Sequence, residues 1–185
     1  MNEVIKNIEE RRSIRKYKKD MIPKEIIEKI LEAGTYAPSG MGKQSSIIIA
    51  ITNKEIRDKL SKLNAKIMGI EKDPFYGAPV VLVVLGKKDI PTYIYDGSLV
   101  MENLMLTANS LGIGSCWIHR AKEEFEAEEG KELLRKLGIN PEEYEGIGNC
   151  ILGYKKEEGN LKPRKENYIY YIDWWGCVFC KKIKE

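Results

Sequence analysis

The sequence predicts a single three-layer domain of the α/β or α+β class. Helical and strand-like segments alternate along its 185 residues in an irregular order, with no internal repeat and no dividing linker. The longest apolar strand, residues 79–85, is apolar at every position, which predicts that both faces of the sheet are covered. At this length one core can bury about 70% of the unfolded chain's surface.

The first part of the chain predicts two helices and a loop. Residues 4–10 carry apolar side chains at helical spacing, and the helix is expected to end near Glu10. A second helix begins at Pro23 and ends at Gly34, with one isoleucine-rich stripe. Residues 36–46 are rich in proline, serine and glycine, and therefore predict a loop.

Strands and helices then alternate to the end of the domain. Apolar and β-branched runs predict strands at 47–52, 79–85, 113–118, 147–154 and 168–172. Helices are expected from Asn53 through Leu63, from 97 to 111 with Asp96 as the cap, and from 128 to 137.

The helix at 97–111 is apolar on nearly every face. Such a helix is normally buried on all sides. In a domain this small that cover must come from the sheet with other helices, or from a second subunit. We therefore expect a homodimer.

Composition is that of a soluble globular protein, with 43% hydrophobic and 32% charged residues and a net charge of +3. The apolar runs fall short of the roughly 20 residues that a membrane span requires. The first residues do not resemble a secretory signal peptide, so a cytoplasmic location is expected.

Several catalytic classes lack their residues. His119 is the only histidine, so a histidine-based metal cluster is excluded, and no metal site is expected. A G-x-S-x-G elbow, a P-loop and a G-x-G-x-x-G fingerprint are all missing. Cys116 is expected to pack in the core. Cys177 and Cys180 have redox or zinc spacing but lie in the tail, and their role stays open.

A basic run provides the candidate binding site. Residues 11–19 contain six cations and no acid. In an extended segment Arg11, Ser13 and Arg15 point to the same side, and two guanidiniums with a hydroxyl suit a phosphate monoester. A solvated basic face is the alternative. Nucleic acid is disfavoured, because the net charge is small and no aromatic residues are interleaved for stacking.

Four short motifs occur between residues 5 and 172. They are 11–17 (RRSIRKY), 37–44 (APSGMGKQ), 111–118 (LGIGSCWI), and 153–154 with 162–165 (GY and KPRK). In this order they resemble the landmark motifs of the FMN-dependent nitroreductase family. The resemblance implies an α+β nitroreductase-like fold with a mixed, mostly antiparallel central sheet flanked by helices. It also implies a homodimer with two FMN sites at the subunit interface.

The resemblance further implies which residues contact FMN. Those expected at the phosphate are Arg11, Ser13, Arg15, Lys162 and Arg164, with a backbone or ribityl contact from Arg12. Those expected along the flavin of the other subunit are Pro38, Ser39 and Gly40, with Gln44 at its polar edge. Those expected at the ring are Asn64 and Lys66 on the pyrimidine side, and the backbone of Trp117, Ile118 and His119.

The second motif departs from the family pattern. Gly42 stands where asparagine is expected, and Ser45-Ser46 replaces Pro-Trp. This affects the expected substrate range more than flavin binding. The resemblance places the domain at residues 1–172 and leaves 173–185 as a tail of unknown role.

The expected activity is that of an FMN-dependent NAD(P)H oxidoreductase. Hydride would pass through flavin N5 to nitroaromatic, quinone or similar acceptors in a ping-pong cycle, without a side-chain acid or base. The sequence does not choose between NADH and NADPH, or name the acceptor. Two alternatives are a protein that stores or senses FMN without nicotinamide turnover, and a small basic module for acidic partners.

Overall fold

The computed structural model describes residues 1–172 and 178–180. Its helices are α1 (Glu3–Glu10), α2 (Lys24–Thr35), the 3-10 turn η1 (Gly40–Gly42), α3 (Lys54–Met68), α4 (Tyr93–Ser110), α5 (Ala121–Glu126) and α6 (Glu128–Lys136). Its strands are β1 (Ser46–Ile51), β2 (Val80–Lys87), β3 (Ile113–Ile118), β4 (Tyr144–Tyr154), β5 (Tyr170–Ile172) and β6 (Val178–Cys180). None of the described helices is long and apolar enough to cross a membrane.

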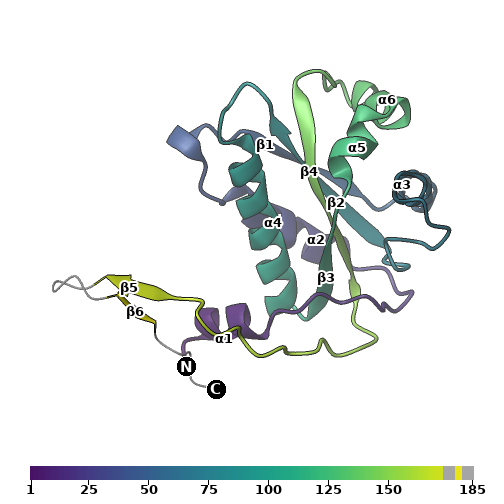
Figure 1. The fold of residues 1–185 in the computed structure, drawn as a ribbon. Coiled ribbons are helices and arrows are strands. Elements are labelled where there is room, and N and C mark those ends of the chain that lie inside the picture. Colours follow the sequence, from purple (N-terminus) through teal and green to yellow (C-terminus); the bar gives the residue numbers. More distant parts are fainter. Residues whose placement is uncertain (173–177, 181–185) are drawn as a thin grey trace.

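Four strands form an antiparallel sheet in the order β1-β2-β4-β3, with helices on both faces. Figure 1 shows α2 and α4 on one face, and α3, α5 and α6 on the other. Side chains of β2 alternate between two apolar clusters. Val80, Leu82 and Val84 join α2 and α4, whereas Val81, Val83 and Leu85 join the opposite layer. The three-layer prediction and the two-sided cover of this strand are thus confirmed.

Helix α4 differs from its prediction in two ways. It begins at Tyr93, so Asp96 lies inside the first turn instead of capping the helix. The helix buries one broad face, which includes Met101 and Leu104, but Leu99 stays 43% exposed in the single chain. Burial on every side, as its composition predicted, is therefore not reached within one chain.

A β-bulge brings β4 close to α4. Val84 pairs with Gly148 and Leu85 with Gly146, so Ile147 is the extra residue. The side chain of Ile147 lies against Gly97, where an added Cβ would stand 2.6 Å from Ile147 Cγ1. A glycine at this position lets the helix pack directly on the bulge.

Three elements were not predicted. The turn η1 lies within the expected loop, the short helix α5 follows β3, and β6 pairs with β5 in a two-stranded sheet. Figure 1 shows this hairpin extending away from the body of the domain. The strand predicted at 168–172 is present as β5, with exposed side chains. Of the tail predicted at 173–185, Cys177 lies outside the described residues, so the suggested cysteine chemistry stays untested.

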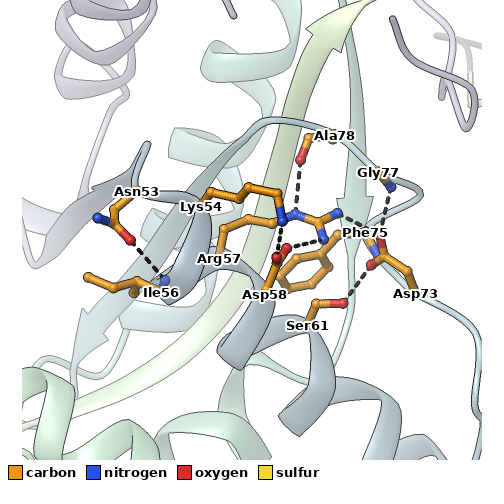
Figure 2. Close-up of polar contacts among 10 residues, drawn as sticks. All are labelled: Asn53, Lys54, Ile56, Arg57, Asp58, Ser61, Asp73, Phe75, Gly77 and Ala78. Carbon is orange, nitrogen blue, oxygen red and sulfur yellow. Dashed lines mark hydrogen bonds and ion pairs between the residues drawn. The ribbon is translucent and has the colours of Figure 1, made fainter. Parts of the chain in front are cut away.

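The segment between α3 and β2 is fixed by a buried arginine, drawn in Figure 2. The Arg57 guanidinium donates to the Ala78 carbonyl at 3.0 Å, to Asp58 at 3.1 Å and to Asp73 at 2.7 Å. It also lies 5.5 Å from the centre of the Phe75 ring. Because all of its nitrogens have partners, this buried charge holds the connection to β2 in one conformation.

Candidate cofactor site

The basic segment that follows α1 lies beside β3. The Ile14 amide donates to the Ser115 carbonyl at 2.9 Å, and Ser13 forms a parallel bridge with Ser115. Ile14 is only 2% exposed and packs in the core. Since side chains alternate along extended backbone, Ser13 and Arg15 face away from that core, as the sequence predicted.

Arg11, Ser13 and Arg15 all act on the pKa of the Cys116 thiol. Burial raises the pKa of this thiol, while Arg15, Ser13 and Arg11 all act to lower it. The balance is a raised pKa, so the thiol is neutral at pH 7. Cys116 is 1% exposed and free, which confirms its prediction as a packing residue.

The Arg11 guanidinium has a donor that is not used in the described part of the chain. Its Nη1 is buried and has no partner within the described part of the chain. Its Nε lies 3.8 Å from Glu102, too far for a good hydrogen bond. Arg12 behaves differently, because its Nη1 donates to the Arg11 carbonyl at 2.5 Å. Within the basic segment, therefore, Arg11 has a buried Nη1 without a partner among the described residues, and Arg15 is exposed.

The second basic cluster is not joined to the first. Arg164 donates to the Lys162 carbonyl at 2.7 Å, and both residues lie on an exposed segment. Among the described residues no hydrogen bond or ion pair connects either of them to Arg11 or Arg15. The chain does return to this region at Gly159, where an added Cβ would be 2.2 Å from Arg12 Cβ.

The glycine-rich loop is anchored by Asp96. Its carboxylate accepts from the Gly40 amide at 3.0 Å, from Ser45 Oγ at 2.7 Å and from Thr92 Oγ1 at 3.1 Å. These three donors lower the pKa of Asp96 although its burial acts in the opposite direction. An added Cβ at Gly40 would lie 2.3 Å from Thr92 Oγ1, so the loop requires glycine here.

Three of the predicted loop residues border one cavity. Pro38, Ser39 and Gln44 line a hollow of about 530 Å³ between α2, the loop and β1. Gln44 has φ +49°, and its backbone N–H donates to Ser39 Oγ at 2.9 Å. The tight local turn thus gives the cavity a defined edge.

The loop and the basic segment lie at opposite ends of α4, as Figure 1 shows. Asp96 holds the loop near the start of the helix. Near its end, Asn109 donates to Asn7 Oδ1 at 2.7 Å, which fixes α1 just before the basic segment. The 13 residues from Asp96 to Asn109 correspond to about 20 Å of helix.

The end of β3 carries the predicted ring contacts. Ile118 is buried, Trp117 is half-buried and His119 is exposed. The indole of Trp117 lies against Gly148, where an added Cβ would be 2.5 Å from Nε1. Arg120 then adopts φ +81° and turns the chain into α5.

Asn64 is fully buried in the single chain, and its Nδ2 donates to the His119 carbonyl at 2.8 Å. Asn64 therefore supports the backbone that is predicted to face the ring, and its own contact with FMN stays a prediction. Lys66 is exposed and lines a separate groove of about 450 Å³ between α3 and α6.

Comparison with known proteins identifies the fold and the family. Residues 8–154 match the nitroreductase family. The chain belongs to this family. A nitroreductase from Bacteroides fragilis, solved with bound FMN, superposes with a TM-score of 0.83 at 30% identity and covers 94% of this chain and 100% of its own. A nitroreductase from Desulfitobacterium hafniense with bound FMN gives 0.83 at 28% identity, with 94% and 100% covered.

A family member from Methanothermobacter thermautotrophicus, provisionally named NADH dehydrogenase/NAD(P)H nitroreductase, is 31% identical over 94% of this chain and 88% of its own length. A Bacillus subtilis protein named FMN reductase [NAD(P)H] is 25% identical over 89% of this chain and 70% of its own. The nitroreductase assignment and the α+β fold expected from the motifs are thereby confirmed.

Proposed function

We propose that this nitroreductase family member is an FMN-dependent NAD(P)H oxidoreductase. The observation that carries the proposal is the Arg11 Nη1, which is buried without a partner among the described residues, in a basic segment that lies beside β3 with Ser13 and Arg15. The family match and the FMN-bound relatives support it.

The donor set fits a phosphate monoester. Two guanidiniums and a hydroxyl supply several charge-assisted hydrogen bonds to one dianion, each contributing about 1.5–3 kcal/mol. Binding the phosphate would also give the buried Arg11 Nη1 the partner it lacks. Lys162 and Arg164 remain proposed contributors, because their segment passes over Arg12 at Gly159.

Bound FMN would accept hydride at N5 from NADH or NADPH and pass electrons to a nitroaromatic, quinone or similar acceptor. The role of the protein would be to bind FMN and to orient its ring. The backbone of Trp117, Ile118 and His119 would form one wall of the ring site, held by the sheet and by Asn64. No side-chain acid or base is assigned to the reaction.

A homodimer would complete the site. In one chain Asp96, which holds the Pro38–Gly40 loop, and Asn109, which holds α1 before the basic segment, are separated by about 20 Å of α4, and this supports a loop supplied by a partner chain. Exposed apolar residues on α1 and α4 offer the interface, with Val4 at 66%, Ile5 at 51% and Leu99 at 43% exposure.

The first test is the visible spectrum of the purified protein, followed by anaerobic addition of NADH and NADPH in separate cuvettes. Flavin absorption bands that bleach with one donor support the oxidoreductase and identify the nicotinamide. Bands that persist with both donors support an FMN-storing protein instead. A colourless protein that takes up no added FMN overturns the proposal.

A further inference from the structure

A cluster of buried polar side chains lies behind the turn at His119. Glu124 on α5, Asn64 on α3 and Asn149 on β4 are all 0% exposed. Asn149 Nδ2 donates to Glu124 Oε2 at 2.6 Å, and Asn64 Nδ2 donates to the His119 carbonyl at 2.8 Å. The Asn64 side chain also lies within hydrogen-bonding reach of the Glu124 carboxyl.

The cluster has fewer hydrogen-bond donors than acceptors among the described residues. Asn64 Oδ1, Glu124 Oε1 and Asn149 Oδ1 have no hydrogen-bond partner in the described part of the chain. An ionised carboxylate only accepts hydrogen bonds, so it leaves all three oxygens unpaired. A protonated Glu124 adds an O–H, which can donate to an amide oxygen of the cluster and reduce the number of buried unpaired atoms.

The charges around Glu124 do not favour its ionised form. On α5, Glu123 lies next to it and raises its pKa, while the nearby Arg120 is paired with Glu123 at 2.8 Å. From α3 and β4 the Glu124 carboxyl faces neutral amides, and on the α6 side Gly130 lies against the backbone carbonyl of Glu124. None of the ion pairs among residues 1–172 includes Glu124. Burial raises the pKa of Glu124 to about 8, and the two asparagines oppose this.

The protonation state of Glu124 affects how the Asn64 amide nitrogen is shared. A protonated carboxyl can donate to Asn64 Oδ1, which leaves Asn64 Nδ2 to the His119 carbonyl. An ionised carboxylate accepts from Nδ2 as well, and therefore competes with the His119 carbonyl for this donor.

We propose that Glu124 is a positioning residue whose protonated carboxyl orients Asn64, and through it the His119 backbone at the end of β3. Its importance for the cofactor rests on the proposed function, in which this backbone faces the flavin. The proton resides on Glu124 at neutral pH and leaves to solvent in mild alkali, which loosens the turn.

Carboxyl carbon NMR of the protein without FMN tests the proton directly. The Glu124 signal, assigned by its loss in Glu124→Gln, is expected to titrate above pH 7. The backbone amide of Arg120, in the peptide that carries the His119 carbonyl, should shift with the same midpoint. Titration in the ordinary glutamate range, or an Arg120 amide that does not follow Glu124, overturns the proposal.

FMN titration between pH 7 and 9 tests the consequence. The dissociation constant of the native protein should rise several-fold with the Glu124 midpoint. Glu124→Gln should bind like the native protein at pH 7 and show no such rise, because its amide donates and accepts as the neutral acid does. This variant keeps His119, so any effect of the imidazole on FMN binding is the same in both proteins and cancels when they are compared.

The two proposals fail in different ways. If the native protein takes up no FMN, the proposed function is overturned, while the NMR titration still decides the state of Glu124. If native protein and Glu124→Gln both bind FMN with the same pH profile, the positioning role is overturned and the proposed function stands.

Discussion

Asp96 accepts a 2.7 Å hydrogen bond from Ser45 Oγ and thereby ties the first turn of α4 to the loop before β1. The same carboxylate also holds the amide of Gly40. One buried side chain thus fixes the loop on which the proposed partner contacts with FMN depend.

Replacing Asp96 with alanine should lower the free energy of unfolding by about 2–3 kcal/mol, because buried donors lose their acceptor. Urea unfolding followed by circular dichroism measures this. Asp89→Ala is the control, since Asp89 is exposed and its ion pair in the described part of the chain is with Lys87 at 3.4 Å; a change under about 1 kcal/mol is expected. Equal losses in both variants would show that Asp96 does not anchor the loop.

The Arg57–Asp73 pair gives a second stability prediction. Asp73 accepts from Arg57 at 2.7 Å and from Ser61 at 2.5 Å, and Asp73→Ala would leave the buried Arg57 without one of its carboxylates. We expect a loss of about 3 kcal/mol. Asp58→Ala removes the other carboxylate of Arg57, which lies at the longer distance of 3.1 Å and has no bond to Ser61, and should cost less than half as much.

The pKa of Asp73 is lowered by its donors despite partial burial. A carboxyl with a lowered folded-state pKa stabilises the protein above its unfolded value of 3.8, and this contribution is lost as pH falls through the folded-state pKa. Acid unfolding of Asp73→Ala should therefore show a weaker pH dependence than that of the native protein.

Segments with a clear period were predictable from the sequence. The apolar run of β2 and the single stripe of α2 allow little choice, because each must face a core. Helix α5 was missed because its six residues, Ala121–Glu126, are too few to establish a period and carry mostly charged side chains.

Residues of the candidate site could be predicted where they are close in sequence. The alternation of side chains along an extended segment, for example, places Arg11 and Arg15 on one side. The site was not predictable where a side chain's partner comes from a distant element. Asn64 reaches the His119 carbonyl across 55 residues, and Asn149 reaches Glu124 across 25. Nothing in the local sequence distinguishes such buried amides from exposed ones.

The phosphate assignment predicts that Arg11→Ala combined with Arg15→Ala weakens FMN binding by at least 100-fold, since two charge-assisted contacts of about 1.5–3 kcal/mol each are lost. Fluorescence titration of FMN measures the dissociation constant. Lys18→Ala with Lys19→Ala is the matched control, because it removes the same charge from exposed positions of the same run. If both double variants bind FMN equally weakly, the loss comes from the change in net charge and the phosphate assignment is wrong.

Glu124 should make the protein less stable as pH rises. Its folded-state pKa of about 8 exceeds the unfolded value of 4.5, so the folded state retains a proton that the unfolded state releases. Between these two values its contribution falls by ~1.4 kcal/mol per pH unit, and it levels off above the folded-state pKa. Urea unfolding across this range should show this decline in the native protein, and Glu124→Gln should lack it.

The apolar face of α1 should control assembly. Ile5 and Ile8 are 51% and 52% exposed in the single chain, and α1 has no buried residue of its own. Ile5→Glu with Ile8→Glu places charges on this face, so light scattering after size exclusion should show monomers in place of dimers. FMN affinity should fall with the dimer fraction, because each site would lose the loop supplied by its partner. Lys6→Glu, which adds an acid at a polar position of α1, should leave both unchanged; a native protein that is already monomeric when loaded with FMN would contradict the two-chain site.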